Sequence, residues 1–404
     1  MRLIGIPEKK YPEYRLDVIF NGYKWDPQFG DNNTIAKYVL VITQEEATDI
    51  DYLTQKLYAE TVAAETVLNN NLALTKPLAL PRQIKKLLKK MVGYDADKHL
   101  RLMRFDFHPV TGGGFAVSEV NSDVPGGLAE ASVMPKIAAD LLKPQNFEYA
   151  DFSKIFIRQL QKKVKPGGTI AVVYCTSYSD DRQVMQFLGD RLTQAGYKII
   201  YLAADHLKFT QKRAESILDG NCGEVDFIFR YTPLEWLVGI KPKNWHGYFD
   251  TITPSCNHPA AIYAQTKRLP LVFDRLEKNG VDLSTWRKLL PETVGVKRCK
   301  KIPDGFIYKP ACGRVGEKIT IKGACPKEEY EKVVKEVRRH PKRYIAQRMF
   351  DSLPLSAEDG GRFHVCLGAY CVDGKAAGYY ARISGSRRID SGAADIPVLI
   401  ENGE

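Results

Sequence analysis

The chain has 404 residues, of which 44% are hydrophobic and 26% are charged, so we expect a soluble globular protein of about two or three domains. It contains no apolar run approaching the ~18 residues of a membrane span, and its N-terminus lacks the apolar core of a secretory signal. The net charge of +11 is diffuse; it would suit a polyanionic small ligand, and no nucleic-acid-binding motif accompanies it.

The eight cysteines are scattered along the chain and form no Cys-x-x-Cys pair. This spacing fits reduced thiols better than a disulfide or zinc framework. We therefore expect the protein in the cytoplasm.

The first hundred residues predict irregular structure followed by two helices. Residues 1–44 read as irregular with short strands, ending in the strand Tyr38–Thr43. Apolar residues keep helical spacing from Glu45 to Leu68. A basic segment from Arg82 then places apolar residues on one helical face and lysines on the other, which is typical of a surface helix.

A β-hairpin follows, and it carries polar residues in a chemically suggestive pattern. Two alternating runs, Leu102–Phe107 and Phe115–Val120, are joined by a glycine-rich turn. Side chains alternate across a strand, so Arg104 and Asp106 share one face, as do Glu119 and Asn121. Such oxygen ligands suit Mg²⁺ bound to phosphates. The alternative is an ordinary solvated hairpin face.

The turn after the hairpin leads into a helix predicted from about Gly127 to Leu142, whose N-terminus would favour an anion. A helix at residues 151–164 precedes a β-α-β pattern, which indicates a parallel sheet with covering helices. Its parts are the strand Thr169–Tyr174, a helix with an N-cap at Ser179–Asp181 and a C-terminal Gly196, the strand Lys198–Ala203 and a third strand, Val225–Phe229. The chain lacks a glycine-rich dinucleotide fingerprint and a P-loop.

The last third of the chain predicts short strands and helices. They are a helix within His258–Lys267, strands at Phe306–Pro310 and Ile319–Lys322, a helix at Glu328–Arg339, a strand at Arg343–Phe350 and a hairpin of Phe363–Val372 with Ala376–Ile383. Asp373–Gly374 is a hairpin dipeptide.

Several motifs occur together in one order: RFDF…SEVNSD, RYTPLEW, QTKRLP, YKPACGRVGE, YIAQRMF and RISGS…DIPVLIE. From about residue 100 to the C-terminus, the chain resembles the synthetase domain of glutathionylspermidine and trypanothione synthetases. The strand lysine Lys309 and the loop GRVGEK are similar to the part of ATP-grasp enzymes that covers nucleotide phosphates. Because the acidic motif precedes the lysines here, the resemblance is to the circularly permuted ATP-grasp subgroup.

The resemblance implies an α/β (α+β) fold: a circularly permuted ATP-grasp with mixed sheets, a β-α-β subdomain and a glycine-containing lid over ATP. The expected division has four parts. They are a helical and irregular part packed on the core (1–100), the metal-binding hairpin and its helices (101–165), the β-α-β subdomain (166–257), and the ATP-binding lid with the C-terminal strands (258–404).

The resemblance also implies roles for individual residues. The metal ligands would be Asp106, Glu119 and Asn121; the ATP-binding residues Lys267, Lys309, Gly313, Arg314, Gly316 and Gln347; and the residues at the transferred phosphoryl group Arg104 and Arg382. Each residue also has a plainer alternative. A lysine on a strand, for example, is usually solvated. Arg382 would then be structural, and Arg314 would lie free in solution.

The implied activity is that of an ATP- and Mg²⁺-dependent ligase that joins a small carboxylate to an amine through an acyl phosphate, releasing ADP and phosphate. Two departures leave glutathione and spermidine open as substrates: no Cys–His pair precedes Lys98 to serve an N-terminal amidase, and the Val124–Gly127 turn differs from the family's. An inactive ATP-grasp nucleotide-binding module and a basic nucleic-acid-binding protein are the alternatives.

Overall fold

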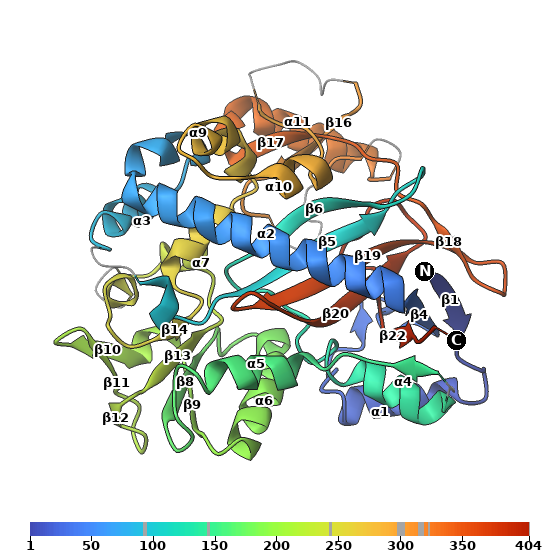
Figure 1. Cartoon of the computed structure of the whole chain (residues 1–404), viewed down its shortest axis with the longest axis horizontal. Coiled ribbons are helices and arrows are strands. Elements are labelled where there is room, and N and C mark those ends of the chain that lie inside the picture. The colour runs from blue at the N-terminus through green and yellow to red at the C-terminus, as the bar shows by residue number, and fades with distance from the viewer. Residues whose placement is uncertain are drawn as a thin grey trace.

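The structure is a computed structural model that describes residues 1–91, 95–143, 146–241, 245–296, 304–313, 319–321 and 324–403. Its central antiparallel sheet has the order β21–β20–β19–β5–β6, with β18 beside β19. Figure 1 shows the long helix α2 running across this sheet. The strands are β5 (Leu102–Pro109), β6 (Phe115–Asn121), β18 (Leu355–Ser356), β19 (Arg362–Val372), β20 (Lys375–Ser384) and β21 (Ala394–Ile396).

Both predicted hairpins of the central sheet are confirmed. β5 pairs with β6, and β19 pairs with β20 and β5. Asp373 and Gly374 have φ angles of 44° and 75°, and a tight two-residue hairpin turn needs this left-handed conformation. The pairing of β19 with β5 brings the two hairpins, which are distant along the chain, into one sheet.

Helix α2 (Gln44–Asn70) confirms the helix predicted at Glu45–Leu68. It begins with a capping box: Thr43 Oγ1 accepts from Glu46 N at 3.1 Å, and the Glu46 carboxylate accepts from Thr43 N at 2.9 Å. Its buried stripe includes Ile50, Leu57, Ala64 and Leu68, which belong to the same core as the strands of the central sheet. The basic helix is also present, as α3 (Arg82–Leu88), with its apolar residues buried and Lys86 exposed.

A second sheet joins the two ends of the chain, in the order β1–β4–β22–β7. Its strands are β1 (Arg2–Gly5), β4 (Tyr38–Thr43), β7 (Phe147–Glu148) and β22 (Val398–Glu401). Because β4 pairs with β22, the N-terminal segment that ends in β4 is built into the same body as residues 398–401 near the C-terminus (Figure 1).

The prediction of only irregular structure and short strands before residue 44 is wrong in one respect. Helix α1 (Tyr11–Phe20) lies there, beside the small strands β2 (Gln28–Phe29) and β3 (Asn32–Asn33). Within α1 only Tyr14 and Val18 are buried. Two apolar contacts are too short a stripe to reveal helical periodicity in the sequence.

The predicted β-α-β unit is confirmed. Its strands are parallel and lie in the order β14–β13–β8–β9. They are β8 (Thr169–Val173), β9 (Lys198–Leu202), β13 (Phe227–Arg230) and β14 (Ser255–Cys256), with helices α5 (Phe152–Leu160) and α6 (Ser179–Gln194) and a small sheet of β10 (Leu207–Thr210), β11 (Arg213–Ser216) and β12 (Gly223–Glu224). The N-cap of α6 is Tyr178, so the predicted cap residues occupy its first turn instead.

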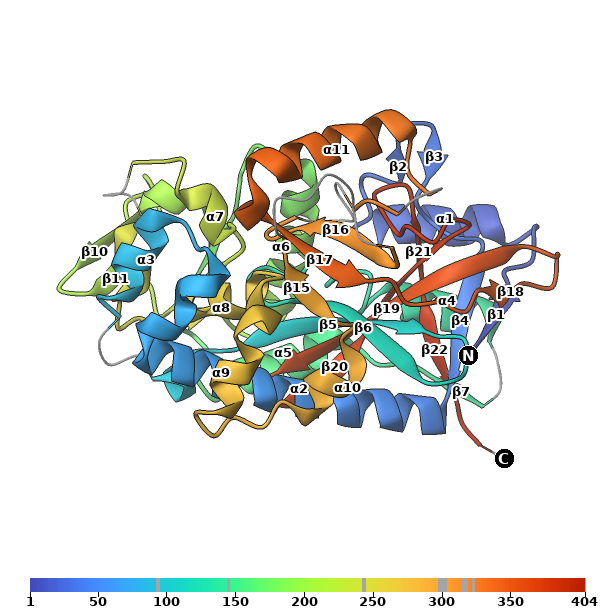
Figure 2. The ribbon, with the colours of Figure 1, turned by 90° about the horizontal axis from the view of Figure 1, so that it is seen from above.

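A further sheet, β15–β17–β16, covers the other side of the β5–β6 hairpin, with helix α11 packed on it (Figure 2). Its elements are β15 (Thr293–Gly295), β16 (Phe306–Pro310), β17 (Tyr344–Arg348) and α11 (Lys327–Arg339). We refer to these four elements as the lid. The predicted strand Ile319–Lys322 is wrong over residues 319–321, and Lys322 lies outside the described residues. The Thr320 hydroxyl accepts from Tyr308 N at 2.9 Å, so a side chain replaces the ladder partner.

Helix α4 (Met134–Leu142) begins later than predicted, because Pro135 sits in its first turn and residues 128–133 form turns. The remaining helices are η1 (Leu72–Leu78), η2 (Ala96–Lys98), η3 (Ala204–His206), α7 (Leu234–Leu237), η5 (His246–Phe249), η6 (Pro259–Ala261), α8 (Ile262–Gln265), η7 (Leu269–Val272), α9 (Phe273–Glu277), α10 (Ser284–Leu289) and η8 (Pro341–Arg343). Over the described ranges, none of the helices has the length and apolar character needed to cross a bilayer.

Candidate functional site

The β5–β6 hairpin gathers Arg104, Asp106 and Asn121 in one buried polar group. Arg104 Nε donates to Asp106 Oδ1 at 2.7 Å, and Arg104 Nη2 donates to Asp106 Oδ2 at 3.1 Å. Asn121, which pairs with Arg104 across the ladder, donates to the same Oδ2 at 3.1 Å. Only 3% of Asp106 is exposed. The carboxylate is therefore held by both neighbours.

Glu119 lies next to two lysines that come from other parts of the chain. Lys267 Nζ lies 2.8 Å from Glu119 Oε2 and also donates to Gly313 O at 2.7 Å. Lys309, on β16, donates to the Ser118 carbonyl at 3.4 Å. Burial raises the pKa of Glu119, but the charges of Lys267 and Lys309 outweigh it and lower that pKa to about 2. This carboxylate is thus ionised at neutral pH.

Lys309 is 3% exposed and has an unusual titration. Burial lowers its pKa to about 8; Glu119 opposes the shift and Lys267 adds to it. Two lysines therefore act on the Glu119 carboxylate in a largely buried environment: Lys267 forms the ion pair, and Lys309 acts through its charge. An anion bound here would relieve the imbalance.

A cavity of about 80 Å³ opens between the lid and the central sheet. Its polar lining includes Asp106, Glu119, Lys309 and Arg382, and its apolar lining comes from Ile307, Ile319, Ile321, Met349, Phe350 and Ile389. Arg382 also donates to the Asp390 carbonyl at 3.3 Å. The cavity lining thus combines charged and apolar side chains.

Gln347 lies on the other side of Glu119, in a smaller cavity of about 20 Å³ that Lys267 also lines. Its Nε2 donates to Thr293 Oγ1 at 3.0 Å, while its buried Oε1 finds no hydrogen-bond partner in the described part of the chain. Gly313 meets Lys267 through its carbonyl, and a Cβ there would come within 2.9 Å of Pro310. Arg314 and Gly316 lie outside the described residues.

Sequence reasoning missed His108, Arg387 and Arg388, which line the larger cavity. Burial lowers the pKa of His108 to about 4, so the ring is neutral at pH 7. Continuing the β5 alternation from Arg104 and Asp106 by one more step would have found His108. Arg388 lies 2.9 Å from Glu329 of the lid, and no local signal predicts this long-range contact.

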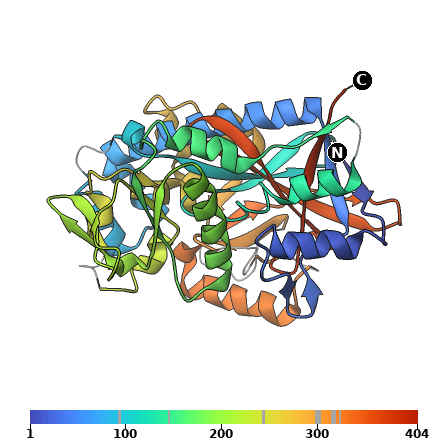
Figure 3. The same ribbon diagram turned by 90° about the horizontal axis from the view of Figure 1, so that it is seen from below.

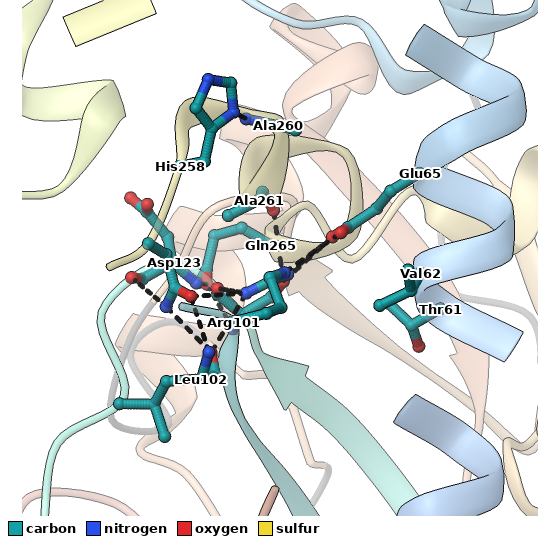
Figure 4. Close-up of polar contacts among 12 residues, drawn as sticks. Thr61, Val62, Glu65, Arg101, Leu102, Asp123, His258, Ala260, Ala261 and Gln265 are labelled. Carbon is teal, nitrogen blue, oxygen red and sulfur yellow. Dashed lines mark hydrogen bonds and ion pairs between the residues drawn. The ribbon is translucent and has the colours of Figure 1, made fainter. Parts of the chain in front are cut away.

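Beneath the hairpin lies a buried polar network, which we call the buried network; it consists of Glu65, Arg101, Ser122, Asp123, Arg230, Asn257 and Gln265. Figure 4 shows its members Glu65, Arg101, Asp123 and Gln265. Arg101 donates to Glu65 through Nη2 at 2.6 Å and to the Ser122 carbonyl through Nη1 at 2.5 Å. Arg230 pairs with Asp123. Asn257 donates to the carbonyls of Leu102 at 2.8 Å and Asp123 at 2.9 Å.

Gln265 connects this network to the site. Its Oε1 accepts from the backbone N–H groups of Ser122 and Asp123, each at 2.8 Å (Figure 4). Ser122 directly follows Asn121, and Gln265 lies two residues before Lys267. One amide therefore fixes the hairpin relative to the segment that carries a site lysine.

A family model described as "Glutathionylspermidine synthase preATP-grasp" matches residues 6–401. In fold, the chain is similar to a glutathione synthetase-like effector from Globodera pallida, with a TM-score of 0.63, 12% identity, and coverage of 96% of this chain and 97% of that one. A Methylobacillus flagellatus protein provisionally described as a gamma-glutamylcysteine synthetase gives a TM-score of 0.45 and 14% identity over 84% of this chain and 87% of its own. No curated protein matches by sequence.

Proposed function

Since the chain belongs to the glutathionylspermidine synthase preATP-grasp family, we propose that it is an ATP- and Mg²⁺-dependent ligase that forms an amide bond between a carboxylate and an amine. The observation that carries this assignment is the pair of lysines, Lys267 and Lys309, that share the single carboxylate of Glu119 beside a cavity. A polyphosphate supplies the negative charge that this arrangement lacks.

In the proposed complex, Lys267 and Lys309 bind the ATP phosphates, and the Gly313 backbone lies along them. The apolar lining of the larger cavity, which includes Ile307, Ile321 and Phe350, is chemically suited to a nucleotide base. The Oε1 of Gln347, which has no hydrogen-bond partner among the residues that the structure describes, can accept a hydrogen bond from the nucleotide or from a water beside it. We assign Arg314 and Gly316 to the same lid.

The donor set suits Mg²⁺ in chemistry: two carboxylates and an amide oxygen from one hairpin, Asp106, Glu119 and Asn121. No group of three His, Cys, Asp or Glu side chains that could hold a metal alone occurs in the described ranges. This fits a metal that is bound largely through phosphates. When bound, Mg²⁺ would neutralise charge on the transferred phosphoryl group.

The proposed reaction needs no protein nucleophile. The substrate carboxylate attacks the γ-phosphorus of ATP, an acyl phosphate forms and ADP leaves. The amine then attacks the acyl carbon, phosphate leaves and the amine nitrogen gives up a proton. Arg104 and Arg382 would hold the charge of the transferred group, while the lysines and the lid keep the phosphates in line and exclude water.

We further propose that the ATP-grasp fold is circularly permuted, with the lid closing over the β5–β6 hairpin. Two features support this arrangement. Asp106 and Glu119 precede Lys267 and Lys309 in the chain, and the lid sheet contributes Lys309 to a cavity whose other wall is the central sheet. The division into segments 1–100, 101–165, 166–257 and 258–404 follows from the same proposal.

Hydroxylamine trapping tests the proposed reaction. A panel of amino acids, short peptides and other carboxylates is incubated with ATP, Mg²⁺ and hydroxylamine, and hydroxamate, ADP and AMP are measured. We expect a hydroxamate with equal ADP. The control is Lys335→Met, which removes an exposed lysine on α11 and should keep the activity. AMP as the product with any acid would contradict the acyl-phosphate route.

A further inference from the structure

A chain of contacts leads from Lys24, in the N-terminal segment, to Arg104. Lys24 Nζ lies 2.8 Å from Asp395 Oδ2 and 3.3 Å from Glu130 Oε1. The other oxygen of Asp395 accepts from Tyr380 OH at 2.7 Å. The guanidinium of Arg104 lies over the Tyr380 ring, 5.1 Å from its centroid. Lys24 is thus linked to Arg104 through one carboxylate and one aromatic ring.

The Tyr380 ring has little freedom to move. A Cβ on Gly127 would come within 2.6 Å of the ring, so the backbone of the turn at Gly126–Gly127 packs closely against it. Arg104 Nη1 donates to Gly126 O at 2.8 Å, and the Tyr370 hydroxyl donates to the same carbonyl. The turn, the ring and the guanidinium therefore form one packed unit.

The backbone on both sides of Lys24 is anchored to helix α6. The Tyr23 hydroxyl donates to Asp190 Oδ2 at 2.7 Å, and Trp25 N donates to Gln183 Oε1 at 2.7 Å. Tyr23 itself has a φ of 59°, an uncommon conformation for a residue other than glycine. Figure 3 shows the dark-blue N-terminal helix and the green helix α6 on the underside of the molecule. These anchors direct Lys24 inward.

Asp395 is held by the N-terminal segment in a second way. Its backbone N–H donates to Thr34 O at 2.7 Å, and its carbonyl accepts from Ala36 N at 2.9 Å. Only 4% of Asp395 and 8% of Glu130 are exposed. Lys24 lies between these two buried carboxylates, and without its cation they repel each other, so the Asp395 side chain is expected to turn away.

We propose that Lys24 is a positioning residue for Arg104: its ion pair keeps the Asp395 carboxylate turned toward Tyr380, and so holds the ring that supports the guanidinium. The N-terminal segment thereby completes the active site. This role rests on the proposed function, in which Arg104 faces the transferred phosphoryl group. Nothing about the identity of the acid or the amine is required.

The binding of MgADP with and without aluminium fluoride tests this role, because aluminium fluoride bound beside ADP mimics the transferred phosphoryl group. Affinities are measured by calorimetry, well below the unfolding midpoint of each variant. The readout is the factor by which aluminium fluoride tightens MgADP binding, a ratio that a general loss of stability leaves unchanged. We expect Lys24→Met to lower this factor about 10- to 100-fold and to leave the affinity for MgADP alone nearly unchanged.

Two variants accompany Lys24→Met. Lys24→Arg retains the charge and should restore most of the tightening. Lys37→Met, the matched control, removes an N-terminal lysine whose ion pair with Asp359, at 2.9 Å, is exposed, and it should have no effect. If Lys24→Met does not fold, Tyr380→Phe interrupts the same series of contacts by removing the hydroxyl that donates to Asp395. We expect the same loss of tightening by aluminium fluoride.

The outcomes distinguish a failure of the positioning role of Lys24 from a failure of the proposed ligase function. Wild-type tightening that persists in Lys24→Met or, where that variant does not fold, in Tyr380→Phe would show that Lys24 is merely structural and would overturn its positioning role. Wild-type protein that does not bind MgADP, or binds it without any tightening, would overturn the proposed function and this role with it.

Discussion

The buried network and the cluster of Lys267 and Lys309 around Glu119 are both rich in charge, but they differ in the ratio of cations to carboxylates. In the network, Arg101 and Arg230 each have a carboxylate partner and further carbonyl acceptors. At Glu119, two lysines share one carboxylate, and burial lowers the pKa of Lys309 to about 8. Buried charges that are each paired favour one geometry, whereas two cations around one carboxylate are set up for a ligand that is still to bind.

The difference predicts which substitutions damage the fold and which damage function. The largest effect on stability is expected for Arg230→Met, which leaves Asp123 buried and unpaired. We expect the free energy of unfolding to fall by about 3–5 kcal/mol, measured by urea denaturation. Arg287→Gln, which removes an exposed ion pair with Glu277, is the control and should change it by less than about 1 kcal/mol. Similar losses in both variants would mean that the network has no special role.

Gln265→Leu tests the connection between the two regions. It removes the acceptor of two buried backbone N–H groups, so we expect a loss of about 2–3 kcal/mol in the free energy of unfolding together with weaker MgATP binding. Gln265→Glu keeps an acceptor oxygen and should be less destabilised. If MgATP affinity, measured by calorimetry on folded protein, stays at the wild-type level in Gln265→Leu, the amide stabilises the fold without positioning the site.

Lys309→Met should show the opposite pattern from Arg230→Met: MgATP binding should weaken while the free energy of unfolding is retained. We expect MgATP affinity to fall about tenfold or more, as for the loss of a hydrogen bond to a charged group of about 1.5–3 kcal/mol. Stability should be unchanged or higher, because a buried cation is removed. Calorimetric titration and urea denaturation measure the two quantities, with Lys335→Met as the control. A variant that loses stability and retains affinity would place Lys309 among the structural residues.

These contrasts also explain how much the sequence could reveal. Both hairpins of the central sheet follow from local patterns, namely two-residue alternation and the turn residues Asp373–Gly374. The same alternation places Arg104 beside Asp106. The lysine partners of Glu119 come from positions far along the chain, and the resemblance to a family named them where periodicity alone could not.

Long-range pairing of buried charges is what the sequence could not reveal. Glu60 and Glu65 lie within the helix predicted at Glu45–Leu68, and both are buried although they are charged. Glu65 pairs with Arg101, and Glu60 accepts from Thr285 N at 2.9 Å at the start of α10. Lys24 likewise meets Asp395 across nearly the whole chain. A charged residue carries no local sign of whether its partner is water or a distant carboxylate.

The smallest predicted effect is a pH dependence, and its sign distinguishes the unbalanced cluster from the paired network. In the free protein the pKa of Lys309 is about 8, below its ordinary value of 10.5, so between these values the unfolded chain holds the proton and the folded chain does not. The contribution of this group to stability therefore rises as the pH increases from 8 to 10.5. Phosphate binding needs the protonated form, so MgATP affinity should fall over the same window, by at most about tenfold per pH unit.

Neighbouring groups do not produce this signal. Glu119, with a pKa of about 2, and Cys366, whose pKa burial raises to about 12, keep their charge states between pH 7 and about 9.5, and His108 stays neutral. Calorimetry in buffers of different ionisation enthalpy should detect proton uptake on MgATP binding near pH 8.5, and Lys309→Met should abolish it. Affinity that is constant from pH 7 to about 9.5 would mean that Lys309 does not bind phosphate as a cation. As the pH rises, the MgATP affinity should fall while the contribution of Lys309 to stability rises. The buried network, in which each charge is already paired, cannot produce this combination.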